Sequence, residues 1–180
     1  GKSIPKIGAI DRLLGKHIFS ADMELDHPLV LKVLSSDRDH ARIIKVDTAD
    51  AVRLKGVVRI FTAEDIPGKN ITGIINKDRP LLAEDKVRSR GDAVALVAAE
   101  NSHVAEKAVS RIRITYEDMP SVHDPEEALE PDAPKVHDKG NLLFTRKIKK
   151  GDPEKAFEQC AVVVEKTYRT SFLEHTYLEP

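Results

Sequence analysis

The sequence has one cysteine, no tryptophan and few aromatic residues, and each shortage excludes a class of site. Cys160 alone cannot form a disulfide within the chain or supply a cysteine-rich zinc or iron–sulfur site. Aromatic residues make up 4% of the chain, and the formal net charge is −1. The chain therefore lacks both the stacking surface and the basic excess of nucleic-acid-binding proteins, and we expect no nucleic-acid partner. We expect Cys160 to be a packing residue.

The sequence also lacks a hydrophobic run long enough to cross a bilayer. The unbroken apolar run from Ala93 to Ala99 suits a buried strand instead. We find no signal peptide, and the low cysteine content favours a cytoplasmic location without a membrane partner. The length of 180 residues, with 41% hydrophobic and 33% charged residues, fits one domain, or one domain with an extension.

The two ends of the sequence lack the marks of a complete protein. The chain starts at Gly1 without an initiator methionine, and it stops at Pro180 directly after a strand pattern. We therefore expect it to be a piece of a longer protein.

The pattern from Gly91 to Pro120 predicts a strand, a helix and a second strand. Ser102 is placed to cap the helix, and from Ile112 the apolar residues alternate with polar ones as in a half-buried strand. If both strands join one sheet, their crossover is right-handed. Nothing in this stretch is chemically reactive, so the pattern indicates a scaffold.

The rest of the chain predicts short helices against a mixed sheet, which is an α+β fold. Strands at 29–34 and 41–46 are close enough to pair as a hairpin. Thr62 with Asp65 forms a capping-box-like helix start, and Asp152-Pro153 starts another. Further strands are predicted at residues 57–61, 142–149 and 161–172.

Reactive constellations are scarce. None of the seven histidines has HxxxH or HExxH spacing, and His40 and His123 suit surface or supporting positions. We therefore predict no catalytic residue and no metal ligand in the chain. The last ten residues differ, because Glu174, His175 and Glu179 gather where the strand pattern ends. They fit either the edge of a site or an ordinary exposed terminus.

Six short segments, in order through the chain, carry a family resemblance. They are SSDRDHARI (35–43), IPGKNITG (66–73), GDAVALV (91–97), ITYEDMP (114–120), residues 150–152 with 156–157, and EHTYLEP (174–180). Together they resemble the N-terminal portion of the molybdopterin-binding large subunit or domain of the xanthine dehydrogenase and aldehyde oxidase family. IPGKNITG and ITYEDMP are more similar to xanthine dehydrogenase than to carbon monoxide dehydrogenase.

The resemblance implies an α/β-hammerhead domain over residues 15–130. Residues 131–180 would then be a linker and the first strand of a truncated molybdopterin-binding domain. It implies an enzyme that hydroxylates a purine, another N-heterocycle or an aldehyde with oxygen from water. Electrons would leave through molybdopterin-bound molybdenum, [2Fe–2S] clusters and FAD in partner domains or subunits. The full enzyme would be a homo-oligomer.

The resemblance places Leu173, Glu174 and His175 near the molybdenum site. Leu173 stands where the family often has a glutamine, and leucine has no hydrogen-bonding side-chain atom. The general base and most pterin contacts of the family lie beyond Pro180. The fragment itself is therefore expected to hold no cofactor, to be inactive, and to serve as a scaffold and subunit contact.

Two alternatives stay open at this point. One is a stand-alone hammerhead domain that binds other proteins. The other is a small independent enzyme using Glu174, His175 and Glu179. The fragment hypothesis makes one structural prediction: Val162, Val164 and Phe172 should pack poorly, because their partners lie elsewhere in the full protein.

Overall fold

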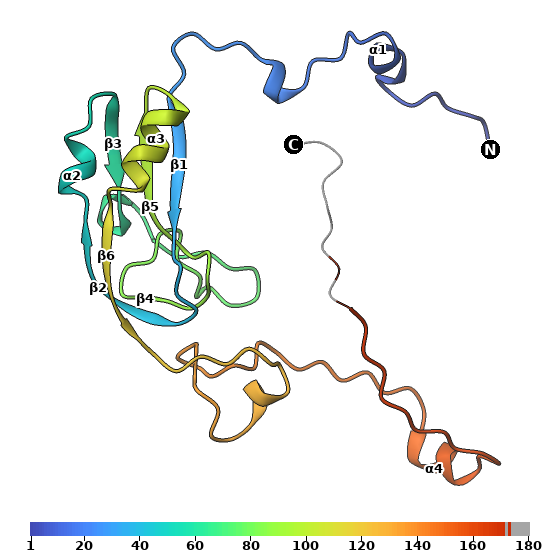
Figure 1. Cartoon of the computed structure of the whole chain (residues 1–180). Helices are drawn as coiled ribbons and strands as arrows, with labels where there is room; N and C mark the ends of the chain where they lie inside the picture. The colour runs from blue at the N-terminus through green and yellow to red at the C-terminus, as the bar shows by residue number, and fades with distance from the viewer. Residues whose placement is uncertain (172, 174–180) are drawn as a thin grey trace. The chain divides into compact units, whose positions relative to one another are not determined.

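The computed structural model describes residues 1–171 and residue 173 of the chain (Figure 1). The chain divides into two compact units. One unit is residues 27–146, and the other consists of residues 1–26 with the residues from 147 onward. The domain boundaries suggested by the sequence, 15–130 and 131–180, stay predictions.

The unit 27–146 is built on two three-stranded sheets, and its pairs of strands are antiparallel. The first sheet has the order β1-β5-β3, and the second has the order β4-β2-β6. The predicted α+β class is confirmed. The strands are β1 Val30–Ser35, β2 Ala41–Asp47, β3 Val57–Phe61, β4 Lys86–Val87, β5 Ala93–Ala99 and β6 Arg113–Asp118.

Helix α3, Ser102–Val109, packs on one face of the first sheet, over β1 and β5 (Figure 1). Small residues make this close approach possible, because Ala105 and Ala108 of the helix are fully buried against Val97 of β5. The cap differs from the prediction: Val104 N–H donates to the Asn101 side chain at 3.0 Å, so Asn101 rather than Ser102 caps the helix. The other helices of this unit are single turns: α2 Ala49–Val52, η2 Ala63–Asp65 and η3 Glu127–Leu129.

Two predictions about strand pairing are wrong. β1 and β2 do not form a hairpin, because β1 pairs with β5 and β2 pairs with β6 and β4. Strands β5 and β6 also lie in different sheets, so the stretch 91–120 is not a crossover within one sheet. The turn after β1 explains the first error, since Ser36 N–H donates to the Asp92 carbonyl at 2.8 Å. That bond ties the end of β1 to β5 instead of returning the chain beside β1.

A second, smaller core joins the two sheets. Ala41 of β2, Val87 of β4 and Val94 of β5 have no exposed surface, and Ala83 completes the group. Val94 thus links the first sheet to the second. The apolar run 93–99 is continuous because β5 contacts apolar neighbours on both of its faces.

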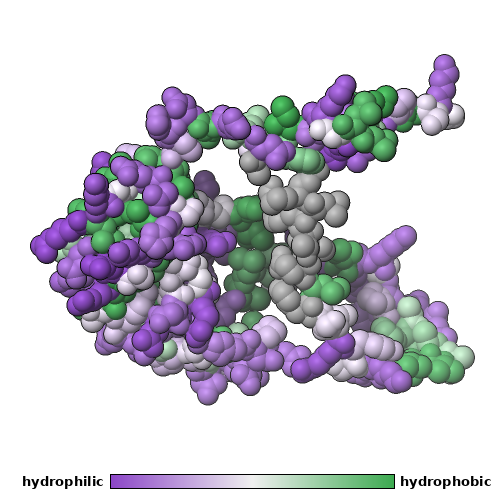
Figure 2. All heavy atoms as spheres, turned by 45° about the horizontal axis from the view of Figure 1, so that its top comes forward, coloured by the Kyte–Doolittle hydropathy of each residue, from purple (hydrophilic) through white to green (hydrophobic). Residues whose placement is uncertain are grey.

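The other unit contains three short helices: α1 Ala9–Leu13, η1 Ser20–Asp22 and α4 Pro153–Glu158. Helix α4 begins as predicted, since Lys155 N–H donates to the Asp152 carboxylate at 3.3 Å. Many apolar side chains here are exposed (Figure 2), and Ile7 is 97% exposed. Cys160 is also exposed, so its predicted role in packing is wrong. Throughout the described residues, no helix is both long and apolar enough to span a bilayer.

The predicted strands at 142–149 and 161–172 are not formed over residues 142–149 and 161–171. A strand needs a neighbouring strand to satisfy its backbone N–H and carbonyl groups, and an alternating pattern alone does not supply one. The prediction of poor packing is confirmed for Val162 and Val164, each 77% exposed. Phe172 lies outside the described residues.

Asn70 organises the loop between β3 and β4. Its side chain donates to the Leu82 carbonyl at 2.7 Å, and its Oδ1 accepts from the N–H groups of Leu81 and Leu82 at 3.0 and 3.1 Å. One side chain therefore closes a loop whose sequence offers little regular structure.

We expect Asn70→Ala to lower the free energy of unfolding by about 2 kcal/mol, since three hydrogen bonds are lost, two of them partly buried. We expect Asn70→Asp to lower the free energy of unfolding by less than Asn70→Ala does. The aspartate retains the acceptor oxygen, but it places a carboxylate beside the Leu82 carbonyl. Urea unfolding measures both. Asn76→Ala, in the same loop, is the control, and an equal loss there would show that Asn70 has no special role.

Candidate functional site

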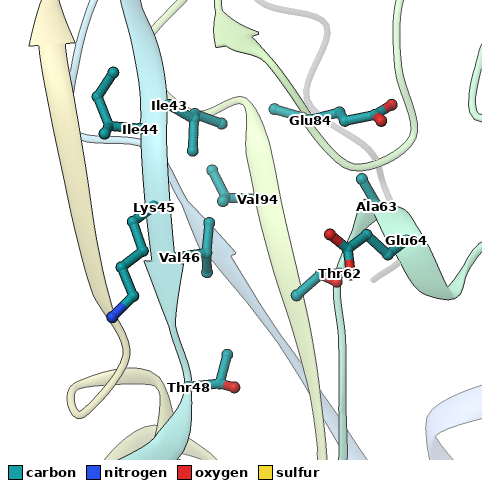
Figure 3. Close-up of a pocket in the computed structure, with 11 residues that line it drawn as sticks. Ile43, Ile44, Lys45, Val46, Thr48, Thr62, Ala63, Glu64, Glu84 and Val94 are labelled. Carbon is teal, nitrogen blue, oxygen red and sulfur yellow. The ribbon is translucent and has the colours of Figure 1, made fainter.

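A hollow of about 430 Å³ opens between strand β2 and the turn that follows β3 (Figure 3). Four apolar lining residues belong to or contact the second core: Ile43 and Val46 of β2, Val94 of β5 and Ala83. Ile43, Val46 and Val94 lie toward one another in Figure 3. The remaining lining residues add polar and apolar groups around them: Ile44, Lys45, Thr48, Thr62, Ala63, Glu64 and Glu84.

Local hydrogen bonds fix the walls of this hollow. The pairing of β2 with β6 shifts between Ile43 and Lys45, which is an irregularity in β2 at the hollow. Ala83 N–H donates to the Ala93 carbonyl at 2.7 Å and holds the opposite wall against β5. The hollow is thus part of the framework of both sheets.

Thr62 forms one edge of the hollow, and Asp65 holds it there, as the capping-box pattern predicted. Thr62 N–H donates to the Asp65 carboxylate at 2.8 Å, and Arg59 Nη2 lies 2.9 Å from its other oxygen. The Thr62 N–H bond and then the Arg59 guanidinium hold the pKa of Asp65 below its ordinary value. The wall therefore depends on an ionised carboxylate.

This pKa shift predicts a pH dependence for the turn. A lowered pKa in the folded state means that the stabilisation is fully present above the unfolded pKa and is lost as the pH falls through the folded pKa. We expect Asp65→Ala to unfold at lower urea than the unsubstituted chain at pH 7, with the difference shrinking below about pH 4. Glu64→Ala is the neighbouring control. A pH-independent difference between the Asp65→Ala and unsubstituted chains would contradict the role of the ionised carboxylate.

Lys45, the one amine in the hollow, is already engaged. Its Nζ lies 2.8 Å from Asp47 Oδ2. That bond, together with the Ala49 N–H, lowers the pKa of Asp47. The Lys45 amine is therefore engaged in an ion pair within its own strand. The lining thus combines this ion pair with apolar side chains of the second core, two threonines and two glutamates.

His40 marks a second, more polar corner of the same unit. It is 4% exposed, and its Nδ1 lies 2.7 Å from the Pro120 carbonyl oxygen. Because a carbonyl only accepts, Nδ1 carries the hydrogen and donates it. Nε2 is buried without a hydrogen-bond partner among the residues that the structure describes. His40 thus ties β2 to the chain after β6: of the surface and supporting positions expected for it, it occupies a buried, supporting one.

Ion pairs surround this corner. Arg90 Nε lies 3.3 Å from Asp39, and Arg38 Nη1 lies 3.7 Å from Asp118. These side chains line a shallow hollow of about 220 Å³. The paired charges stabilise the turn but leave little net charge to attract an ion.

The residues assigned to the molybdenum site by resemblance are only partly described. Leu173 is 79% exposed, while Glu174, His175 and Glu179 lie outside the described residues. Within residues 1–171 and 173, no group of three or more His, Cys, Asp or Glu side chains could hold a metal ion. The positions of Leu173, Glu174 and His175 near molybdenum stay a prediction.

The hollow and the His40 corner were missed from the sequence. The hollow depends on contacts between strands of different sheets, which no local pattern encodes. His40 follows Asp37 and Asp39 in a polar turn, and only the long-range bond to Pro120 shows that it is buried. The one local sign in the sequence is the small residue Ala41 next to His40. In the structure Ala41 is fully buried, so the backbone is enclosed there.

Two family descriptions match the chain in succession. "Aldehyde oxidase and xanthine dehydrogenase, a/b hammerhead domain" matches residues 14–120, and "Molybdopterin cofactor-binding domain" matches residues 136–180. The chain belongs to the aldehyde oxidase and xanthine dehydrogenase family. The predicted hammerhead fold, followed by the start of a molybdopterin-binding domain, is confirmed.

Individual relatives agree with this assignment. The chain is 39% identical over its whole length to the nicotinate dehydrogenase large molybdopterin subunit of Eubacterium barkeri, of which it covers 42%. Over 93% of its length it is 38% identical to a probable xanthine dehydrogenase subunit of Bacillus subtilis, of which it covers 23%. Among solved structures, aldehyde oxidoreductase from Desulfovibrio gigas matches 88% of the chain with a TM-score of 0.77 and 28% identity. The chain covers 19% of that protein, so it spans less than half of each of these relatives.

Proposed function

We propose that the chain is the N-terminal part of the large subunit of a molybdenum hydroxylase. The observation that carries this proposal is the order of the two family matches, hammerhead at 14–120 and molybdopterin-binding at 136–180. A scaffold domain placed ahead of a cofactor domain is the arrangement of a catalytic subunit. We place the enzyme in the cytoplasm, with iron–sulfur and FAD domains or subunits as partners and a homo-oligomeric full assembly.

The proposed reaction is hydroxylation of a carbon in an N-heterocycle, including a purine, or of an aldehyde carbon. Water supplies the oxygen atom, and the substrate loses two electrons and a proton as the C–H bond becomes C–OH. Relatives named for nicotinate and for xanthine favour an N-heterocycle as substrate. Bound molybdopterin would let molybdenum accept the electron pair, which iron–sulfur clusters and FAD carry onward.

Residues 1–171 and 173 do not supply a fitting set of groups for this cofactor. Leu173 has a hydrocarbon side chain, and no group of three or more His, Cys, Asp or Glu side chains among these residues could hold a metal ion. We therefore assign no catalytic step to the described residues. Their proposed roles are to form a rigid scaffold and to provide contact surfaces, with Leu173, Glu174 and His175 approaching the molybdenum site in the whole enzyme.

The test uses the whole large subunit, produced with its partner subunits in a host that makes molybdopterin. Nicotinate, xanthine and an aromatic aldehyde are each offered with an artificial electron acceptor and ¹⁸O-labelled water. We expect ¹⁸O in a hydroxylated N-heterocycle and molybdenum in the purified complex. A complex that contains molybdenum but oxidises none of the three substrates would contradict the proposed substrate classes. Residues 1–180 produced alone should retain no molybdopterin.

A stand-alone hammerhead domain for protein contact is the second candidate. The compact unit 27–146, with two cores of its own, favours it. The reading frame downstream of Pro180 separates the two. Several hundred further codons support the hydroxylase subunit, whereas a stop codon directly after Pro180 supports the stand-alone domain and directs the test to pull-down experiments.

A further inference from the structure

The first sheet has two faces: α3 covers one, and the second core covers the other at its Val94 end. The pairing register shows which residues share each face, since directly opposite residues point the same way. Val97 of β5 pairs with Lys32 and Ile60, and Lys32 Nζ reaches Glu106 of α3 at 3.3 Å. This face therefore lies under the helix.

The opposite face carries two rows of side chains across the sheet. One row is Val33, Leu96 and Phe61, which are paired directly from β1 through β5 to β3. The next row is Leu31, Ala98 and Arg59. Apart from Arg59, both rows are apolar. Ala98 is buried at 4% exposed, and we call the exposed and half-buried apolar residues of these rows the open face: Leu31, Val33, Phe61 and Leu96.

The open face is exposed where it crosses β1. Leu31 is 60% exposed and Val33 is 46% exposed, although both sit in a regular strand beside a buried one. Two further exposed apolar residues, Leu29 at 49% and Val58 at 56%, adjoin these rows in the sequence. Contiguous apolar surface of this kind usually marks a contact site, whereas single exposed apolar residues are ordinary.

A fixed cation borders the open face. The Arg59 guanidinium lies 4.9 Å from the centre of the Phe61 ring, and Asp65 holds it at 2.9 Å. These two contacts hold the guanidinium at the edge of the open face. The border is polar and ordered while the centre is apolar, which is the arrangement of a protein–protein contact.

We infer that the open face is covered by a later segment of the same polypeptide, downstream of residue 180, that presents apolar side chains to it. The inference rests on the proposed function, in which the chain is one part of a longer large subunit. The chain covers 42% of the E. barkeri relative, so a subunit of that size has ample sequence left to cover it. The second family match begins only at residue 136, which places most of any molybdopterin-binding domain after the hammerhead unit.

A segment of the same chain suits this face better than a separate protein. Covalent connection keeps the segment at a high effective concentration, so the apolar strand is covered as soon as the subunit folds. A face left for a separate subunit would stay exposed until assembly, and exposed apolar strands promote aggregation. A second copy and a partner subunit are the competing occupants.

The test places p-benzoyl-phenylalanine at position 31 in the whole large subunit within its assembled enzyme. Phe61 is a second position, because the new residue keeps its phenyl ring. Val52 on α2 is the matched control, since it is 55% exposed and lies outside the open face. The enzyme is prepared from mixed ¹⁴N- and ¹⁵N-labelled chains, irradiated, digested and analysed by mass spectrometry, which separates crosslinks within one chain from those between copies.

We expect positions 31 and 61 to crosslink to a peptide of the same chain beyond residue 180, at least tenfold more than position 52 does. A main crosslink to another copy, to a partner subunit or within residues 1–180 would overturn the inference, as would a yield no greater than the control. The unsubstituted enzyme is assayed in parallel. An active molybdenum hydroxylase with crosslinks to a partner subunit refutes the inference alone, whereas an assembly without molybdenum or hydroxylation refutes the proposed function.

Discussion

Val97→Asp should unfold the unit 27–146 at room temperature. Val97 has no exposed surface, occupies the central strand of the first sheet and packs beneath α3 among Ala95, Ala99 and Ala105. A carboxylate there would be surrounded by hydrocarbon, and the cation opposite it in the strand register, Lys32, is already paired with Glu106 at 3.3 Å. Burial of the carboxylate costs on the order of 5 kcal/mol, which is comparable with the entire stability of many domains.

Circular dichroism and urea unfolding of the purified chain measure this effect. The matched control is Val52→Asp, which makes the same chemical change at a position that is 55% exposed. It should change the free energy of unfolding by about 0.5 kcal/mol or less. If both variants unfold at the same urea concentration, the central strand is not where the structure places it.

Gly73→Ala should disrupt the loop that Asn70 closes. Gly73 has φ of +144°, a conformation that residues with a side chain rarely adopt. A β-carbon added there would overlap the backbone carbonyl of Asn76, which cannot move aside as a flexible side chain could. The strained conformation alone costs about 1–3 kcal/mol, so the loop should rearrange rather than accept the methyl group.

Hydrogen exchange over residues 70–82 and thermal unfolding together report this change. We expect faster exchange at the Thr72 and Arg79 amides, which now bond reciprocally across the loop at 2.6 and 3.1 Å. Gly68→Ala is the control, because an added β-carbon there meets no atom within 4 Å and its φ is not in the left-handed region. Unchanged exchange in Gly73→Ala would show that the turn is looser than its backbone geometry indicates.

The two predictions concern different parts of one scaffold. Val97 supports the sheet whose far side is the open face, and Gly73 shapes the loop leading from β3 toward β4. Substitution of either residue would affect the proposed enzyme by impairing its folding and not by altering a catalytic step. In the whole enzyme we therefore expect reduced yield of assembled protein, with turnover per molybdenum unchanged in the molecules that do assemble.

The sequence located most strands of the hammerhead unit, because their signals are local. The strands predicted at 93–99 and 57–61 have the same bounds as β5 and β3 in the structure. Thr62 with Asp65 and Asp152 with Pro153 start helical turns as predicted, since a cap is a bond between residues three apart. The family was also within reach, because six short segments keep their order along the chain.

Strand partners were beyond the reach of the sequence. The hairpin expected between 29–34 and 41–46 was plausible by spacing, but β1 pairs instead with β5, about sixty residues further along the chain. Antiparallel pairing depends on which strand fills the neighbouring position, and that choice is made by the whole core. The pattern at 161–172 failed for a related reason, since residues 161–171 have no neighbouring strand in the structure.

For the candidate site too, some features could be predicted from the sequence and others only from the structure. The sequence pointed to Leu173, Glu174 and His175 through the family motif, and their place near molybdenum stays a prediction. It gave no sign of the hollow beside β2 or of the open face, because both arise from residues of different strands. Buried His40 was likewise missed, since its partner, the Pro120 carbonyl, is eighty residues away.

By itself, then, the sequence determined most strands of the hammerhead unit, two of the helix starts and the family, all of which depend on short-range patterns of apolar and polar residues. The tertiary structure decided the division into two sheets, the burial of His40 and which face of β1 is exposed. Those features follow from contacts between residues far apart in the chain, where burial of apolar surface in one common core selects among many locally acceptable pairings.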